Sequence, residues 1–200
     1  MGTALGFYML VVTLLPLGLG ADLNLLSRIA PGLLWIALLL AALLSLGRVF
    51  SSDYEDGSLD ILATGSMPME LVVTAKALAH WISTGIPLAL MAPVLGLLLN
   101  LDIGAYPLLV ATMLVGTPAV SFIGAVGAAL TLRAYRGGLL IALLVLPLYV
   151  PVLIMGAGSV ELAAAGQGGQ GQLLLLAAML VVAAAFAPWA IAAALRISSE

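Results

Sequence analysis

Long apolar runs that carry no charge in their interior alternate with short polar turns along this chain. A water-soluble fold cannot be built from such runs, because each must face lipid or another apolar helix. The composition agrees: 64% of the residues are hydrophobic and 8% are charged, against about 45–50% and about 25% in soluble domains. The sequence therefore predicts an all-α, polytopic membrane protein.

Six runs have the length of about 17–25 residues that a membrane-spanning helix needs. We expect one transmembrane domain over 1–200, with a polar segment at 51–70 between the second and third spans. The expected spans are 3–20, 32–50, 71–99, 106–132, 139–158 and 173–195. Small residues at four-residue multiples in the fourth span predict close approach of another helix, within the bundle or across a dimer. These residues are Gly116, Gly124 and Ala128.

The basic residues indicate the orientation of the bundle. Arg28 lies at one end of the expected spans, and five basic residues lie at the other: Arg48, Lys76, Arg133, Arg136 and Arg196. By the positive-inside rule the second end, both termini and segment 51–70 are cytoplasmic, and 21–31, 100–105 and 159–172 face outward. As an alternative, residues 18–21 resemble a signal-peptide cleavage site, although no basic residue precedes them.

Several function classes lack the residues they need. No acidic or basic residue lies in the middle of a span, where ion-driven transporters usually carry one. The chain has no phosphate-binding loop, no cysteine and a single histidine, so a nucleotide site, a thiolate metal site and a zinc-protease histidine pair are not expected. If the chain drives transport, we expect the energy to come from another subunit.

Segment 51–70 is the largest part of the chain able to contact a soluble partner. Ser52 and Glu55 match a capping box, and Gly57 permits a turn before a short helix that Gly65 ends. The following helix is predicted to begin at Pro68, with Glu70 in its first turn, where the helix dipole favours a carboxylate.

This pattern favours an amphipathic helix with Leu59, Leu62 and Ala63 on one face. The alternative is a solvated connection without a partner. As a coupling segment for a soluble subunit it would use Asp53, Glu55, Asp56, Gly57, Ser58, Leu59, Asp60 and Leu62.

Lys76, His80 and Trp81 open the third span, and such residues are typical of the membrane interface. We expect this helix to begin in the cytoplasm and to enter lipid near Trp81. His80 could ligate heme iron, but an interfacial histidine bonded to a backbone carbonyl is the more common arrangement. No metal site is expected otherwise.

Short segments spread from the first outer turn to the C-terminus carry a family resemblance. They are LSRIAPG (26–32), DGSL (56–59), AKALAHW (75–81), GTP (116–118), RGG (136–138), LPLYVP (146–151) and AAALRIS (192–198). With these segments in this order, the chain resembles the CcmB family, the heme exporter permeases of bacterial cytochrome c maturation.

The resemblance implies a six-helix ABC permease of the type-2 exporter kind in the bacterial inner membrane. It implies a homodimer that works with two copies of a separate ATPase subunit, which binds the ATP, and with other cytochrome c maturation membrane proteins. Heme is the implied substrate for delivery to the periplasm, with no cofactor bound by this chain and no nucleic acid involved. In such permeases the loop between the second and third spans usually couples to the ATPase.

Family members usually have a cytoplasmic lead-in helix before the first span, whereas the first expected span here begins at about residue 3. That element is therefore not expected within this sequence. Two alternatives to heme export stay open at this point. One is an ABC permease for another substrate, such as a lipid or a drug, and the other is a scaffold that holds a heme-handling complex together.

Overall fold

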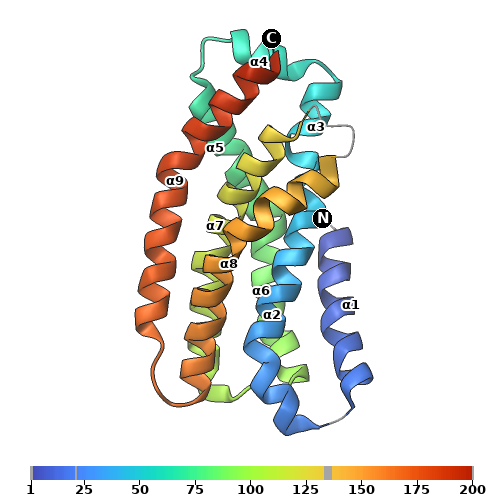
Figure 1. Ribbon diagram of the computed structural model, residues 1–200, viewed down its shortest axis with the longest axis vertical. Coiled ribbons are helices and arrows are strands. Elements are labelled where there is room, and N and C mark those ends of the chain that lie inside the picture. Colours follow the sequence, from blue (N-terminus) through green and yellow to red (C-terminus); the bar gives the residue numbers. More distant parts are fainter. Residues whose placement is uncertain (1, 21, 133–136, 200) are drawn as a thin grey trace.

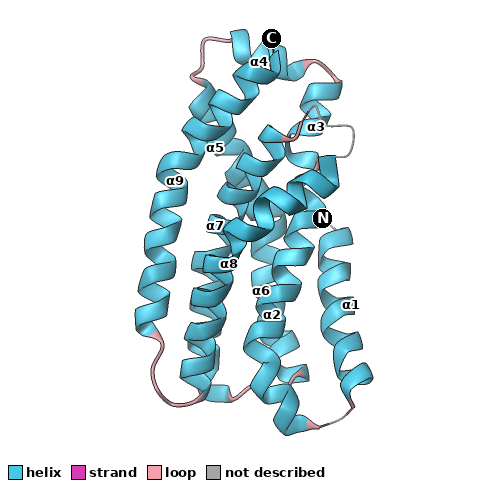
Figure 2. Ribbon diagram, viewed as in Figure 1, coloured by secondary structure: helices cyan, strands magenta, loops and turns pink. Residues whose placement is uncertain are grey.

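The computed structural model describes residues 2–20, 22–132 and 137–199; the side chains of residues 60, 63, 64, 137 and 197–199 also lie outside the description. The described chain is a bundle of helices with short connections (Figures 1 and 2). In chain order the elements are α1 (Gly2–Leu19), α2 (Leu23–Leu46), α3 (Arg48–Glu55), α4 (Ser58–Thr64), α5 (Met69–His80), the π-helical turn η1 (Trp81–Gly85), α6 (Ile86–Leu98), the 3₁₀ turn η2 (Ile103–Ala105), α7 (Tyr106–Leu130), α8 (Gly137–Ala164) and α9 (Gln170–Ser199).

Six segments in the described chain are long and apolar enough to cross a membrane, as the sequence predicts. They are Gly2–Leu19, Leu23–Glu55, Met69–Leu98, Ile103–Leu130, Gly138–Ala164 and Gln170–Arg196. Large exposed apolar side chains, such as Leu17, Leu143 and Phe186, cover α1, α8 and α9, and such side chains suit contact with lipid. In Figure 1, α4 and the C-terminus lie at one end of the bundle, and the α1–α2, α6–α7 and α8–α9 connections lie at the other.

The second span begins nine residues earlier than the sequence pattern indicates. Asp22 caps α2, because its carboxylate accepts hydrogen bonds from the backbone N–H groups of Asn24 at 3.0 Å and Leu25 at 3.2 Å. Pro31 then lies inside the helix without ending it. Most of the expected outer segment 21–31 is therefore helical, and its Leu26 and Ala30 are buried.

Helix α7 lies at the centre of the bundle, in contact with α2, α5, α6, α8 and α9. Its glycines permit this, as the sequence predicts: a Cβ at Gly116 would lie 2.3 Å from the ring of Trp35 on α2, and one at Gly124 would lie 2.5 Å from Leu46. The Trp35 ring is fully buried, and Gly156 of α8 faces it equally closely. The close approach therefore joins α2, α7 and α8 of one protomer.

Candidate functional site

The polar hairpin is the name used here for α3, α4 and the start of α5, residues 48–76. Its tip turns at Gly57, which has a φ of +76° that suits glycine. Helix α4 then begins at Ser58 and ends before Gly65, and Pro68 precedes α5 with Glu70 in the first turn, so these predicted boundaries are confirmed.

The predicted capping box is wrong. Ser52 lies inside α3, which begins at Arg48 directly after the single residue Gly47 that separates it from α2. Because the second span continues into α3 almost without a break, no helix N-terminus occurs at Ser52 for a side chain to cap. Glu55 instead ends α3, with its side chain exposed.

Asp56 organises the turn. Its Oδ1 accepts a hydrogen bond from the backbone N–H of Ser58 at 2.9 Å, and the Ser58 hydroxyl donates to the Asp53 carbonyl at 3.4 Å. The hydroxyl and the backbone N–H of Ser58 stabilise the charged carboxylate, so the pKa of Asp56 lies below its usual value. Asp56 and Ser58 therefore hold the shape of the tip.

Two ion pairs connect α5 to its neighbours. Lys76 of α5 pairs with Asp53 of α3, with both side chains about a quarter exposed or less, and Arg196 of α9 pairs with Glu70 at 3.0 Å. Partly exposed pairs of this kind stabilise by about 0–1 kcal/mol each. The first pair lies within the hairpin and joins α3 to α5, and the second joins the hairpin to α9. The buried side chains of Phe50, Leu59 and Val73 pack the hairpin against the core.

The hairpin offers a different apolar surface from the one that the sequence pattern indicates. Leu59 is 4% exposed and packs with the core, and Leu62 is half-buried. Tyr54, Ile61, Met67 and Leu71 are large exposed apolar side chains of the hairpin, at 42%, 72%, 61% and 59%. The side chains of Asp60 and Ala63 lie outside the described residues.

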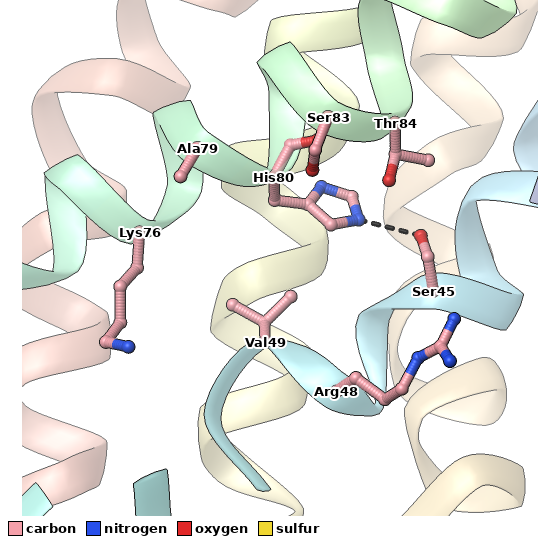
Figure 3. A pocket seen from close by; sticks show the side chains of 8 residues that line it. All are labelled: Ser45, Arg48, Val49, Lys76, Ala79, His80, Ser83 and Thr84. Carbon is pink, nitrogen blue, oxygen red and sulfur yellow. Dashed lines mark hydrogen bonds between the residues drawn. The ribbon is translucent and has the colours of Figure 1, made fainter. Parts of the chain in front are cut away.

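His80 joins three helices below the hairpin. Its Nε2 lies 2.8 Å from the Ser45 hydroxyl of α2, and its Nδ1 lies 3.1 Å from the Ser121 hydroxyl of α7. Figure 3 shows the Ser45 bond at the wall of a pocket that also contains Arg48 and Lys76. The prediction of a backbone carbonyl as partner is wrong, because two serine hydroxyls face the ring. With both nitrogens engaged and the side chain 8% exposed, iron ligation would require the loss of one of these bonds.

Trp81 begins the π-helical turn η1 directly after His80. Its indole N–H donates to the Thr117 hydroxyl of α7 at 3.0 Å, and Thr117 in turn donates to the Met113 carbonyl at 2.7 Å. Turns of this kind are rare and are frequent at functional positions. The junction of α5, η1 and α7 is thus fixed by side-chain hydrogen bonds within a largely apolar bundle.

Comparison with known proteins identifies the family. The CcmB protein family matches residues 1–198. The chain belongs to the CcmB family. The chain is 57% identical to heme exporter protein B of Paracoccus denitrificans over 197 residues. This alignment covers 98% of this chain and 90% of the relative. It is 50% identical over 196 residues to that of Haemophilus influenzae, covering 98% and 89%, and 44% identical over 196 residues to that of Escherichia coli K12, covering 98% and 89%.

Membership of the CcmB family makes this chain a multi-pass membrane protein and the permease subunit of an ABC transporter. The hairpin therefore belongs to a transporter subunit, and so does the His80 junction, the name used here for His80 and Trp81 with their hydrogen bonds to α2 and α7. The residues that sequence reasoning missed are the partners of the junction, namely Ser45, Thr117 and Ser121. The signal available for them was a small polar residue isolated in an apolar run, which often hydrogen-bonds across helices.

Proposed function

We propose that this chain is the permease subunit of an ABC transporter that delivers heme to the periplasm for c-type cytochrome biogenesis. Relatives that cover nearly the whole chain carry the name heme exporter protein B, which supports heme as the substrate. The proposed location is the bacterial inner membrane, with both termini and the polar hairpin in the cytoplasm. The proposed assembly is a homodimer with two ATPase subunits and further cytochrome c maturation membrane proteins.

The observation that carries the coupling proposal is the construction of the polar hairpin. It combines exposed acidic and apolar side chains at its surface with buried side chains, such as Phe50, Leu59 and Val73, that pack against the core of the bundle. At its base, α5 continues through η1 to α6, and His80 bonds α2 and α7. A partner that pulls on the hairpin would therefore move α5 against two other spans. ATP binding and hydrolysis would take place in the partner.

Pull-down of the ATPase subunit tests the coupling. We expect the Glu55→Lys, Met67→Asp double variant to recover much less ATPase subunit than the unaltered chain, since both side chains are exposed on the hairpin. Ile103→Asp is the matched control, because Ile103 is 83% exposed on η2 at the opposite end of the bundle. Equal recovery by the hairpin variant and the control would reject the hairpin as the docking element.

Topology is tested with single cysteines, since the natural chain has none. We expect Glu55→Cys to react with a membrane-impermeant maleimide only after the cells are opened. Gln167→Cys, which lies in the exposed α8–α9 connection, is expected to react in intact spheroplasts. Labelling of Glu55→Cys from outside would overturn the orientation and the coupling proposal with it.

Heme delivery is tested separately from docking. In cells that lack the native permease gene, this chain is expected to restore covalent heme attachment to a c-type cytochrome only when an active ATPase subunit is present. Restoration with a hydrolysis-deficient ATPase would favour a scaffold, and ATPase stimulation by lipid but not by heme would favour another substrate.

A further inference from the structure

A pocket opens beside the His80 junction, between the end of α2 and the α5–η1 segment. Its volume is about 370 Å³, and polar and apolar groups contribute to its lining (Figure 3). Arg48 and Lys76 are the charged residues among the described side chains that line it, and none of those side chains is acidic. In Figure 3 they lie on two sides of Val49. This pocket is thus cationic in a chain whose formal net charge is -3.

The two cations differ in what neutralises them. Lys76 is paired with Asp53, so that pair has no net charge. Arg48 makes one hydrogen bond within the described chain, to the Thr3 hydroxyl at 3.3 Å, although a guanidinium has five N–H donors. The pocket therefore presents about one unit of uncompensated positive charge, with most of the guanidinium donors of Arg48 available.

The surroundings of the pocket indicate what kind of anion fits. Arg48 lies two residues beyond Leu46, the last residue of α2, at the end of an apolar span. On α5 and η1, the pocket residues Ala79 and Ser83 are next to Leu78 and Ile82, which are 37% and 58% exposed. A ligand here can place an anionic group on Arg48 and apolar chains on these side chains. A lipid at the membrane interface has that form.

We propose that this pocket binds the headgroup phosphate of an anionic phospholipid. A phosphodiester carries one negative charge, which matches the uncompensated charge of Arg48. Its oxygens accept paired hydrogen bonds from a guanidinium, an arrangement that a lysine cannot reproduce. Lys76 is the second cation of the pocket and strengthens the attraction when its contact with Asp53 loosens. A free phosphate ester offers the same phosphate chemistry, and the exposed Leu78 and Ile82, next in sequence to pocket residues, favour the lipid.

Native mass spectrometry of the purified full chain tests the proposal. The chain is mixed with equal amounts of phosphatidylglycerol and phosphatidylcholine that have the same acyl chains. Both lipids have the phosphodiester, but the choline cation of phosphatidylcholine offsets its charge and is repelled by Arg48. We therefore expect phosphatidylglycerol to be retained about tenfold over phosphatidylcholine, a ratio of the size that one charged contact gives. Arg48→Gln is expected to remove this preference, and Arg48→Lys to retain part of it. Arg28→Gln, at the opposite end of α2, is the matched control and is expected to keep the preference.

Equal preference in the Arg48→Gln and Arg28→Gln variants would overturn the proposal. So would Arg48-dependent binding of glycerol 3-phosphate with no further gain from the acyl chains, because the ligand would then be a soluble phosphate. Thr3→Val removes the one hydrogen bond of Arg48 and keeps its charge, so it separates packing from charge. This variant is expected to retain phosphatidylglycerol, and loss of the preference there would also reject the site. None of these measurements depends on the ATPase or on heme.

Discussion

Substitution of Gly156 by alanine is predicted to destabilise the bundle through the buried ring of Trp35. A Cβ at this position would lie 2.3 Å from Cε2 and Cζ2 of the indole and 2.8 Å from Cη2. The ring has no room to retreat, because its Cη2 lies against the α7 backbone at Gly116, so closely that a Cβ there would be 2.3 Å from it. Overpacking of this kind costs about 1–3 kcal/mol, which exceeds the gain of up to about 1 kcal/mol from higher helix propensity.

The same reasoning predicts coupling between the two residues. In a Trp35→Phe background the indole atoms that the new methyl group would meet are absent, so Gly156→Ala is expected to cost about 1–2 kcal/mol less than it does alone. The measurement is the free energy of unfolding in mixed detergent micelles, followed by circular dichroism. Gly158→Ala is the control on the same helix, since a Cβ at this position would lie 4.0 Å from Gln172 Cγ, an ordinary van der Waals distance. Equal stability of the Gly156→Ala and Gly158→Ala variants, or an unchanged cost in the Phe background, would refute the packing argument.

Three further predictions concern the hairpin and its base. His80→Ala is expected to lower the free energy of unfolding by about 1–3 kcal/mol, because two hydroxyl partners lose their bond in a buried place; a loss no larger than that of an exposed alanine substitution would contradict this. Asp53→Lys and Lys76→Asp are each expected to speed amide hydrogen exchange in α3, and the double variant is expected to restore it, by about 1 kcal/mol or less. For Asp56 the folded-state pKa is lowered, so its stabilisation of the tip is present above the ordinary value of about 3.9 and is lost as the pH falls through the lowered value. The Ser58 amide shift in NMR spectra should follow that transition, whereas the Asp56→Asn variant should show no such transition.

The sequence was sufficient for the number of spans and for much of the hairpin. Uninterrupted apolar runs leave few alternatives to spanning helices, and Gly57, Gly65 and Pro68 mark local boundaries through their own backbone preferences. The start of α2 was harder, because Arg28 and Pro31 resemble a polar turn. The cap at Asp22 and the burial of Leu26 outweigh that local pattern.

The His80 junction could not be derived from the sequence because it depends on how three spans pack. Ser45 and Ser121 lie 35 residues before and 41 residues after the histidine, and nothing local brings them together. The surface of α4 was missed for a related reason. Leu59 has the spacing of an exposed apolar face, but contact with the core buries it and leaves other hairpin side chains exposed. Helical spacing defines faces, and tertiary packing decides which face is covered.

The π-helical turn at Trp81–Gly85 has a consequence for the length of the third span. A widened turn of this kind accommodates one residue more than the regular α-helical pitch requires, and it occurs in a segment whose buried residues His80, Thr84 and Leu88 recur every fourth position. Deletion of one residue within it would let the backbone return to the ordinary pitch. Such a deletion would leave the faces of both flanking segments as they are. If the turn instead tightened to the ordinary pitch with all its residues kept, the segment on the hairpin side would rotate by about 100° relative to the segment in the bundle. The π-helical turn is therefore the point in this span at which a change of pitch rotates the hairpin end relative to the part that lies in the bundle.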